Sequence, residues 1–258
     1  MNTYFKNILI YSLGSLILIS SISFRALRLS ERKVTGIQIE IMNDQEFYLI
    51  DQIEIQALLN KEHSITVLGS KYDQVDFKLL EKQVEENPFV AQIDVFMNVN
   101  GVLGAKVSQA QPIGRLMNPR GSDQYIDITG KLLPMNTDYT ARVPLISFAK
   151  YPQWESHLGE DDFGKQLMEF LIFINKDELW KAQIAQLAVS EENELTLWPQ
   201  MTKQLILFGP ADEIEEKFKK LKLFYKEVLP KKGWNTYSSK LKIQESNCVQ
   251  VNKLMNNG

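Results

Sequence analysis

The chain has 258 residues, of which 44% are hydrophobic and 24% charged, and 29 basic against 32 acidic residues give a net charge of −3. This balance is typical of a globular protein and supplies no broad positive field for nucleic acid. One cysteine and two histidines exclude an intramolecular disulfide and argue against a zinc site of nitrogen and sulfur ligands. The mean hydropathy of −0.21 excludes a polytopic membrane protein.

An uncharged segment of eighteen residues, 7–24, lies near the amino terminus between Lys6 and Arg25. As an α-helix it would be roughly 27 Å long, which is close to the hydrocarbon thickness of a bilayer. Its length, the single lysine before it and the poor cleavage site after it favour an uncleaved anchor over a signal peptide. We therefore expect a short cytoplasmic segment at 1–6, a single transmembrane helix at 7–27 and a linker at 28–36.

The basic residues that flank this segment predict an orientation. Lys6 precedes it, whereas Arg25, Arg28, Arg32 and Lys33 follow it. By the positive-inside rule, this distribution would place the bulk of the chain in the cytoplasm. The local charges thus oppose an extracytoplasmic location for the carboxy-terminal part.

The residues after the linker predict one strand followed by two helices. Residues 34–42 alternate, with isoleucines on one face, and this period of two predicts a strand. Apolar residues recur at helical spacing over 50–58. A second helix is expected to begin after Asp76, a suitable N-cap, and to end before Asn87-Pro88.

Two further strand-like runs, 89–99 and 102–110, are joined by Asn100-Gly101. This dipeptide predicts a hairpin with a type I′ turn, which needs positive φ at both positions. The predicted order is therefore β-α-α-β-β, and we assign this module to residues 37–111.

From residue 112 onward, short apolar runs alternate with turn residues and predict a meandering antiparallel sheet up to about residue 146. An amphipathic helix is expected at 161–176, and strands are expected at 194–198 and 204–208.

A second amphipathic helix is expected after Gly209-Pro210, with acidic residues in its first turns and lysines toward its end. A last strand from Lys240 to about Val251 follows. The predicted fold class is α+β, with a mixed antiparallel β domain and two flanking helices over 112–251 and a frayed tail at 252–258.

The sequence contains no recognisable catalytic constellation. His157 has no nucleophile at a defined spacing, and Asp161-Asp162 directly precede a predicted helix, where they are expected to act as capping charges. Cys248 falls in a predicted strand and is interpreted as a small hydrophobic residue. We predict no catalytic residue, no cofactor and no metal site.

Short phrases occur in a fixed order along nearly the whole chain. They are Leu80-Glu81, Asn87-Pro88-Phe89-Val90, Gln111-Pro112-Ile113, Tyr125-Ile126-Asp127 with Gly130 and Pro134, Val143-Pro144-Leu145-Ile146, Leu197, the run 205–209 followed by Lys217 and Leu221, Trp234, and Leu241-Lys242-Ile243. Their order and spacing resemble the FtsQ/DivIB family of bacterial cell-division proteins, in particular its Bacteroidetes branch. The β-α-α-β-β module resembles a POTRA domain.

The resemblance implies a non-catalytic, single-pass inner-membrane protein with its bulk in the periplasm, which contradicts the orientation that the local charges predict. It implies a position at the division septum and a role in linking early and late septal components. FtsB-like and FtsL-like proteins, with other members of the division machinery, are the partners that it implies.

In the family, FtsB adds a strand to the edge formed by the last β strands. An open edge offers unpaired N–H and C=O groups for such pairing. By position in the last predicted strand, the candidate contact residues are Ile243, Gln244, Glu245, Ser246, Asn247, Cys248 and Val249. Without the resemblance, a strand paired on both sides is the favoured reading.

Two other functions remain open from the sequence. One is a POTRA-bearing accessory protein of envelope assembly or polypeptide transport. The other, less favoured, is a membrane-tethered hydrolase that uses His157 and nearby carboxylates.

Overall fold

The computed structural model describes residues 11, 13–17, 20, 32–42, 49–60, 67–136, 139–152, 154, 156–159, 161–200, 205–227, 239–243 and 249–253. The chain divides into two units, Met1–Gln109 and Ala110–Gly258. Residues 11, 13–17 and 20 are helical, but most of the predicted anchor at 7–27 lies outside the described residues. In the described part of the chain, no helix has both the length and the apolar character needed to cross a bilayer.

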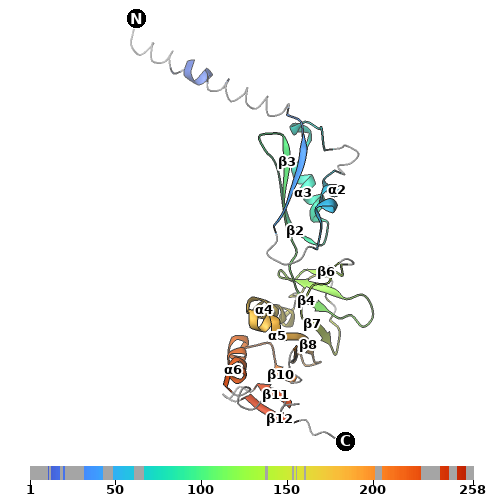
Figure 1. Cartoon of the computed structure of the whole chain (residues 1–258), viewed down its shortest axis with the longest axis vertical. Coiled ribbons are helices and arrows are strands. Elements are labelled where there is room, and N and C mark those ends of the chain that lie inside the picture. The colour runs from blue at the N-terminus through green and yellow to red at the C-terminus, as the bar shows by residue number, and fades with distance from the viewer. Residues whose placement is uncertain are drawn as a thin grey trace. The chain divides into compact units, whose positions relative to one another are not determined.

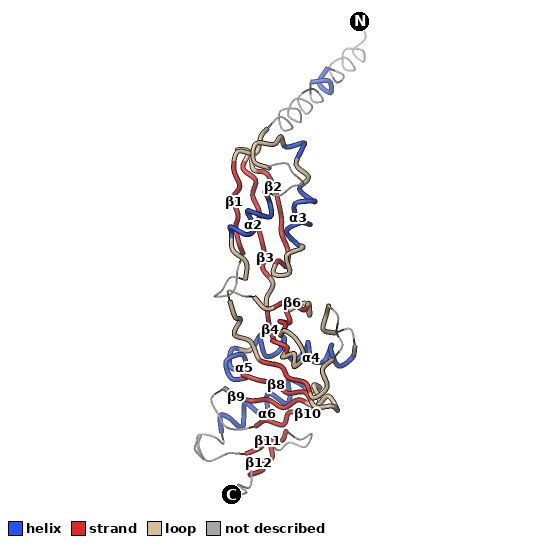
Figure 2. The backbone as a smooth tube through the Cα atoms, turned by 90° about the vertical axis from the view of Figure 1, so that its right-hand side faces the viewer, coloured by secondary structure: helices blue, strands red, loops and turns tan. Residues whose placement is uncertain are grey.

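The first unit contains a three-stranded sheet with the order β1-β3-β2 (Figure 1). β1 runs parallel to β3, and β2 runs antiparallel to β3. Two helices lie over one face of this sheet (Figure 2). The elements in chain order are β1 (Gly36–Met42), α2 (Gln52–Leu59), the 3₁₀ turn η1 (Tyr72–Gln74), α3 (Phe77–Glu85), β2 (Val90–Met97) and β3 (Val102–Gln109).

Capping aspartates begin both helices of this unit. The Asp51 side chain accepts a hydrogen bond from the Glu54 amide at 2.6 Å, and Asp76 accepts one from the Leu79 amide at 3.1 Å. Each bond satisfies a donor that the first turn of a helix leaves free. The β-α-α-β-β order and the helix start at Asp76 are therefore confirmed. The core between helices and sheet consists of fully buried aliphatic residues, among them Ile55, Leu59, Leu80, Val84, Leu103 and Val107.

The hairpin between β2 and β3 is confirmed, but its predicted turn type is wrong. Gly101 has a φ of 82°, whereas Asn100 is not among the residues with positive φ. The Gly101 amide donates to the Asn98 carbonyl at 3.1 Å, and the Asn98 amide donates to the Val102 carbonyl at 3.0 Å. This pattern fits a three-residue loop that ends in a left-handed glycine. The Asn98 side chain favours it, because it accepts the amides of Asn100 and Val102.

The second unit contains a nine-stranded sheet with the order β12-β11-β10-β9-β8-β7-β4-β5-β6. Its elements in chain order are β4 (Pro112–Leu116), β5 (Gln124–Asp127), β6 (Leu132–Pro134), β7 (Leu145–Phe148), α4 (Asp162–Lys176), α5 (Glu178–Gln183), β8 (Ile184–Val189), β9 (Leu195–Pro199), β10 (Leu205–Gly209), α6 (Ile214–Glu227), β11 (Ser239–Ile243) and β12 (Val249–Lys253).

The sheet is mixed, and the antiparallel meander that the turn pattern predicts is only one part of it. β4 pairs with β7, β7 with β8, and β10 with β11 in parallel. Parallel neighbours require a crossover connection, commonly helical. Helices α4 and α5 lie in the connection from β7 to β8, and α6 lies in that from β10 to β11. The meander prediction is confirmed for β4, β5 and β6, which pair antiparallel in chain order. It is wrong for β7, which pairs in parallel with β4, a strand distant in the sequence.

The three helices of this unit lie on the same face of the sheet (Figures 1 and 2). Phe218 of α6 is the centre of an aromatic group in the core. Its ring centroid lies 4.8 Å from that of Trp180 and 5.1 Å from that of Phe208. The rings of Phe170 and Phe173 on α4 lie 5.6 and 5.0 Å from it. One aromatic side chain thus contacts α4, α5 and β10 together.

A buried aspartate closes the turn between β5 and β6. Asp127 is only 3% exposed, and its Oδ1 accepts the amides of Thr129 and Lys131 at 2.8 and 2.9 Å and the Thr129 hydroxyl at 2.7 Å. Gly130 in this turn has a φ of 89°, and a Cβ there would lie 2.7 Å from the Leu158 carbonyl oxygen. In the Tyr-Ile-Asp phrase and the glycine that follows it, Asp127 therefore supplies the acceptor of the turn and Gly130 supplies its positive φ.

We predict that Asp127→Ala lowers the free energy of unfolding of the second unit by about 2–4 kcal/mol, because three hydrogen bonds to one buried carboxylate oxygen are lost. All four tryptophans follow residue 110, so tryptophan fluorescence in a urea titration of the full chain follows this unit alone. Asp162→Ala is the matched control, because the Asp162 side chain is 99% exposed. Equal, small effects of both substitutions would contradict the assigned turn.

Candidate functional site

The carboxy-terminal end of the nine-stranded sheet is a hairpin. β11 pairs in parallel with β10, with Leu205 opposite Lys240 and Leu207 opposite Lys242. On its other side β11 pairs antiparallel with β12, from Ser239 opposite Lys253 to Ile243 opposite Val249. The predicted single strand from Lys240 to Val251 is therefore wrong, because its residues form two strands. The residues between the two strands are polar, and polar residues also occur in a strand with one solvated face. The sequence therefore does not show where β11 ends and β12 begins.

The hairpin places the predicted contact residues differently. Ile243 ends β11, and its side chain is 7% exposed and packs in the core of the unit. The Ile243 backbone pairs with Val249 of β12, whereas the pairing of β11 with β10 ends at Lys242. Val249 begins β12. Gln244, Glu245, Ser246, Asn247 and Cys248 lie outside the described residues.

β12 is the end strand of the sheet. It pairs with β11 on one side, and no strand of the described residues pairs with it on the other. In an antiparallel pair, the residues of each strand direct their N–H and C=O groups alternately toward and away from the partner. Every second residue of β12 therefore directs backbone polar groups away from β11.

The opposite end of the sheet differs in its backbone chemistry. β6 has three residues and ends in Pro134, which has no amide hydrogen to donate. The Leu132 amide donates to the Ser156 carbonyl at 2.8 Å, and Lys131 forms an isolated bridge with His157. Short length, proline and cover are the features that protect a sheet edge, and β6 has all three.

A buried lysine fastens α6 to β10, next to the hairpin. Lys217 is 7% exposed, and its Nζ donates to the Pro210 carbonyl at 2.8 Å and forms an ion pair with Asp212. The same ammonium lies 5.2 Å from the centre of the Phe208 ring, a geometry for cation–π attraction. A buried charge needs such partners, so Lys217 fixes the connection that precedes α6.

A cavity of about 650 Å³ lies beside the end of β11 and is lined by Lys242, Ile243, Lys217, Phe208 and Glu194, among others. It brings the end of the hairpin and the buried lysine to one place in the fold. Ile243, a predicted contact residue, thus packs in the core and also lines this cavity.

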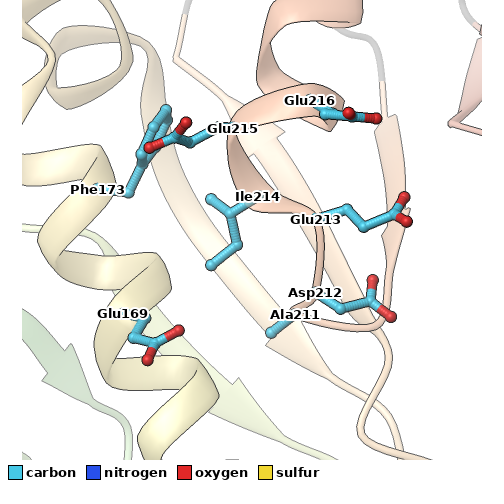
Figure 3. A pocket seen from close by; sticks show the side chains of 8 residues that line it. All are labelled: Glu169, Phe173, Ala211, Asp212, Glu213, Ile214, Glu215 and Glu216. Atoms are coloured by element: carbon cyan, nitrogen blue, oxygen red, sulfur yellow. The ribbon is translucent and has the colours of Figure 1, made fainter.

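A second cavity of about 470 Å³ lies between α4 and α6, and its lining includes Glu169, Glu213, Glu215 and Glu216 (Figure 3). The carboxylates of Glu213 and Glu216 point away from those of Glu169 and Glu215 in Figure 3. Within the described residues, no group of three or more acidic, histidine or cysteine side chains is arranged to hold a metal ion.

The polar residues considered for catalysis have structural surroundings. His157 is exposed, and its Nδ1 lies 2.9 Å from the Ser156 hydroxyl. Asp161 accepts the Gly164 amide at 2.6 Å at the start of α4, which confirms its predicted capping role. Two consecutive elements, α5 and β8 at Glu178–Val189, are absent from the sequence prediction.

Two family models match the chain. The model described as FtsQ/DivIB, C-terminal related, matches residues 111–247, and the model described as a POTRA-like domain matches residues 32–108. A search of the curated proteins found no match. The second match covers β1 to β3, and the first covers β4 to β11.

We predict that Lys217→Met lowers the free energy of unfolding of the second unit by about 1–3 kcal/mol, because the hydrogen bond to the Pro210 carbonyl and the ion pair with Asp212 are lost while the aliphatic packing is retained. Tryptophan fluorescence in urea measures the change. Lys219→Met is the control, since Lys219 is an exposed lysine on the same helix. A Lys217→Met protein as stable as the control would contradict the role assigned to this ammonium.

Proposed function

Because the chain belongs to the FtsQ/DivIB family, we propose that it is a non-catalytic scaffold of bacterial cell division that binds other division proteins through the outer edge of β12. The POTRA-like first unit and the FtsQ/DivIB-related second unit together make it a division-associated, POTRA-containing protein. The scaffold role and the partners are the proposal.

The observation that supports the proposal is the difference between the two ends of the nine-stranded sheet. β6 is short, ends in Pro134 and contacts Ser156. β12 has five residues and pairs on one side only within the described chain. A strand from a partner can extend the sheet there by backbone hydrogen bonds, and side chains then decide which partner is accepted.

The proposed partners are FtsB-like and FtsL-like proteins. Val249 supplies backbone groups at the start of β12, and Ile243 holds β11 in the core so that β12 has a fixed template. Gln244, Glu245, Ser246, Asn247 and Cys248 stay in the proposal as contact candidates between the two strands.

The proposal includes a membrane anchor at 7–27, a cytoplasmic amino terminus and a periplasmic bulk at the division septum. The family supports this topology. The local lysine and arginine count opposes it, so orientation is a point at which the proposal can fail.

The matches also bear on the two other functions. A POTRA-like domain alone would suit an envelope assembly or transport accessory protein, but the match at 111–247 favours cell division. The contact between Ser156 and His157 joins two exposed neighbours in sequence, which gives a hydrolase no enclosed site for its substrate.

We predict that proline at one of two neighbouring β12 positions abolishes partner binding without unfolding the hairpin. Of Gln250 and Val251, one directs its amide toward β11 and the other away from it. Proline at the outward position removes a donor and blocks an added strand. Co-purification of FtsB-like and FtsL-like proteins with the full chain measures binding, and amide exchange of β11 reports the hairpin.

The matched controls are Gln250→Ala and Val251→Ala, which keep both amides and should keep partner binding. Proline at the inward position should weaken the β11–β12 hairpin itself. Normal co-purification with both proline variants would rule out strand addition at β12.

A phosphatase that needs disulfides for activity, fused after residue 258, is expected to be active in cells, because disulfides form outside the cytoplasm. A fusion after residue 6 is the control and should be inactive. If the carboxy-terminal fusion is inactive and the amino-terminal one active, the bulk of the chain is cytoplasmic and the proposed topology is wrong.

A further inference from the structure

A third cavity in the second unit has a different lining from the acidic one. It has a volume of about 470 Å³ and lies where the end of β7, the start of α4 and the turn from β8 to β9 come together. Phe148, Tyr151 and Trp154 contribute aromatic rings to it, and Lys150, Asp161 and Glu191 contribute charges. Neither the β12 edge nor the buried Lys217 belongs to this cavity.

The ring of Phe148 stands nearly perpendicular to each of the other two rings. The ring centroids of Phe148 and Tyr151 lie 6.1 Å apart at an interplanar angle of 76°, and those of Phe148 and Trp154 lie 5.6 Å apart at 81°. All three side chains are half-buried, so the protein covers part of each ring and the cavity meets the rest. Several aromatic rings that line one cavity can form an aromatic cage, which binds cations through the ring quadrupoles.

The Asp161 carboxylate is held in place by two hydrogen bonds. Asp161 Oδ1 accepts the Gly164 amide at 2.6 Å, and Asp161 Oδ2 accepts the Trp154 indole N–H at 3.4 Å. This carboxylate therefore links one wall of the cavity to the first turn of α4. With Glu191, two carboxylates and one ammonium line the cavity, so its charge favours a positive guest.

The titratable groups next to the cavity leave its net charge negative. Burial raises the pKa of the Tyr151 hydroxyl, and the nearby Asp123 adds to the effect, so Tyr151 stays neutral. Burial also opposes ionisation of Asp123, but hydrogen bonds from the Asn118 amide and the Arg115 side chain outweigh it and hold the pKa of Asp123 below its usual value. Arg115 is engaged by this ion pair at 2.6 Å.

We propose that this aromatic cavity binds the guanidinium group of an arginine side chain on a partner polypeptide. A guanidinium is planar, stacks on aromatic rings and is weakly hydrated, and its N–H fork matches a carboxylate. A neutral apolar side chain would leave the second carboxylate of the cavity without a counter-charge beyond Lys150, and an acidic side chain would be repelled by Asp161 and Glu191. The site is separate from the β12 edge and gives a partner a second point of attachment.

The test uses the full chain in a non-ionic detergent and two small probes, N-acetyl-arginine methylamide and its neutral isostere N-acetyl-citrulline methylamide. Binding is followed by NMR at the indole N–H signal that disappears in Trp154→Phe. The arginine amide should shift this signal saturably and bind at least about tenfold more tightly than the citrulline amide.

Two conservative substitutions locate the guest. Asp161→Asn keeps a residue type that caps helices well but removes the charge, and it should weaken the arginine amide about tenfold. Asp162→Asn changes an exposed neighbour that pairs with Lys165 and should leave binding unchanged. Equal binding of the two probes, no saturable shift, or an arginine affinity unaffected by Asp161→Asn would each overturn the proposal.

Discussion

An open β sheet leaves a row of backbone N–H and C=O groups at each of its two end strands, and these groups need partners from elsewhere. The nine-stranded sheet of this chain meets that requirement differently at its two ends. At β6 the strand is short, Pro134 lacks a donor, and Ser156 accepts the Leu132 amide. At β12 the described residues supply a partner strand on the inner side only.

The presentation of β12 depends on the packing behind it. β12 lies on β11, β11 lies parallel to β10, and β10 is connected to α6. Phe218 packs against Phe208 of β10 with centroids 5.1 Å apart, and Lys217 binds the Pro210 carbonyl just beyond that strand. These two consecutive residues of α6 fix the strand on which the hairpin is built. Lys217, one of the residues that carry the family resemblance, thus stabilises the packing behind the proposed interface.

Local patterns in the sequence predict the first unit well. Period-two isoleucines mark β1, Asp76 marks the start of α3, and Asn100-Gly101 marks a hairpin. The turn type is wrong because Asn98, two residues earlier, accepts two amides and sets another loop. That effect needs a side chain outside the dipeptide, which a two-residue rule does not consider.

The second unit is predicted less completely because its order depends on distant contacts. α5 has six residues, too few for a helix to be stable without tertiary packing, and β8 follows it directly without a turn signal. The parallel pairs of β7 and β10 join segments that only the folded core brings together. The same limit applies to the site. Polar and apolar residues are interspersed from Lys240 to Val251, and this pattern does not show that the segment divides into β11 and β12.

The central claim is that a partner strand pairs with the outer edge of β12. Amide hydrogen exchange of the full chain, alone and in complex with FtsB-like and FtsL-like proteins, measures this directly. The account predicts that the outward amides of β12 exchange much more slowly in the complex, while amides of β6 exchange at the same rate. Unchanged exchange at β12 in a complex that has formed would contradict the claim.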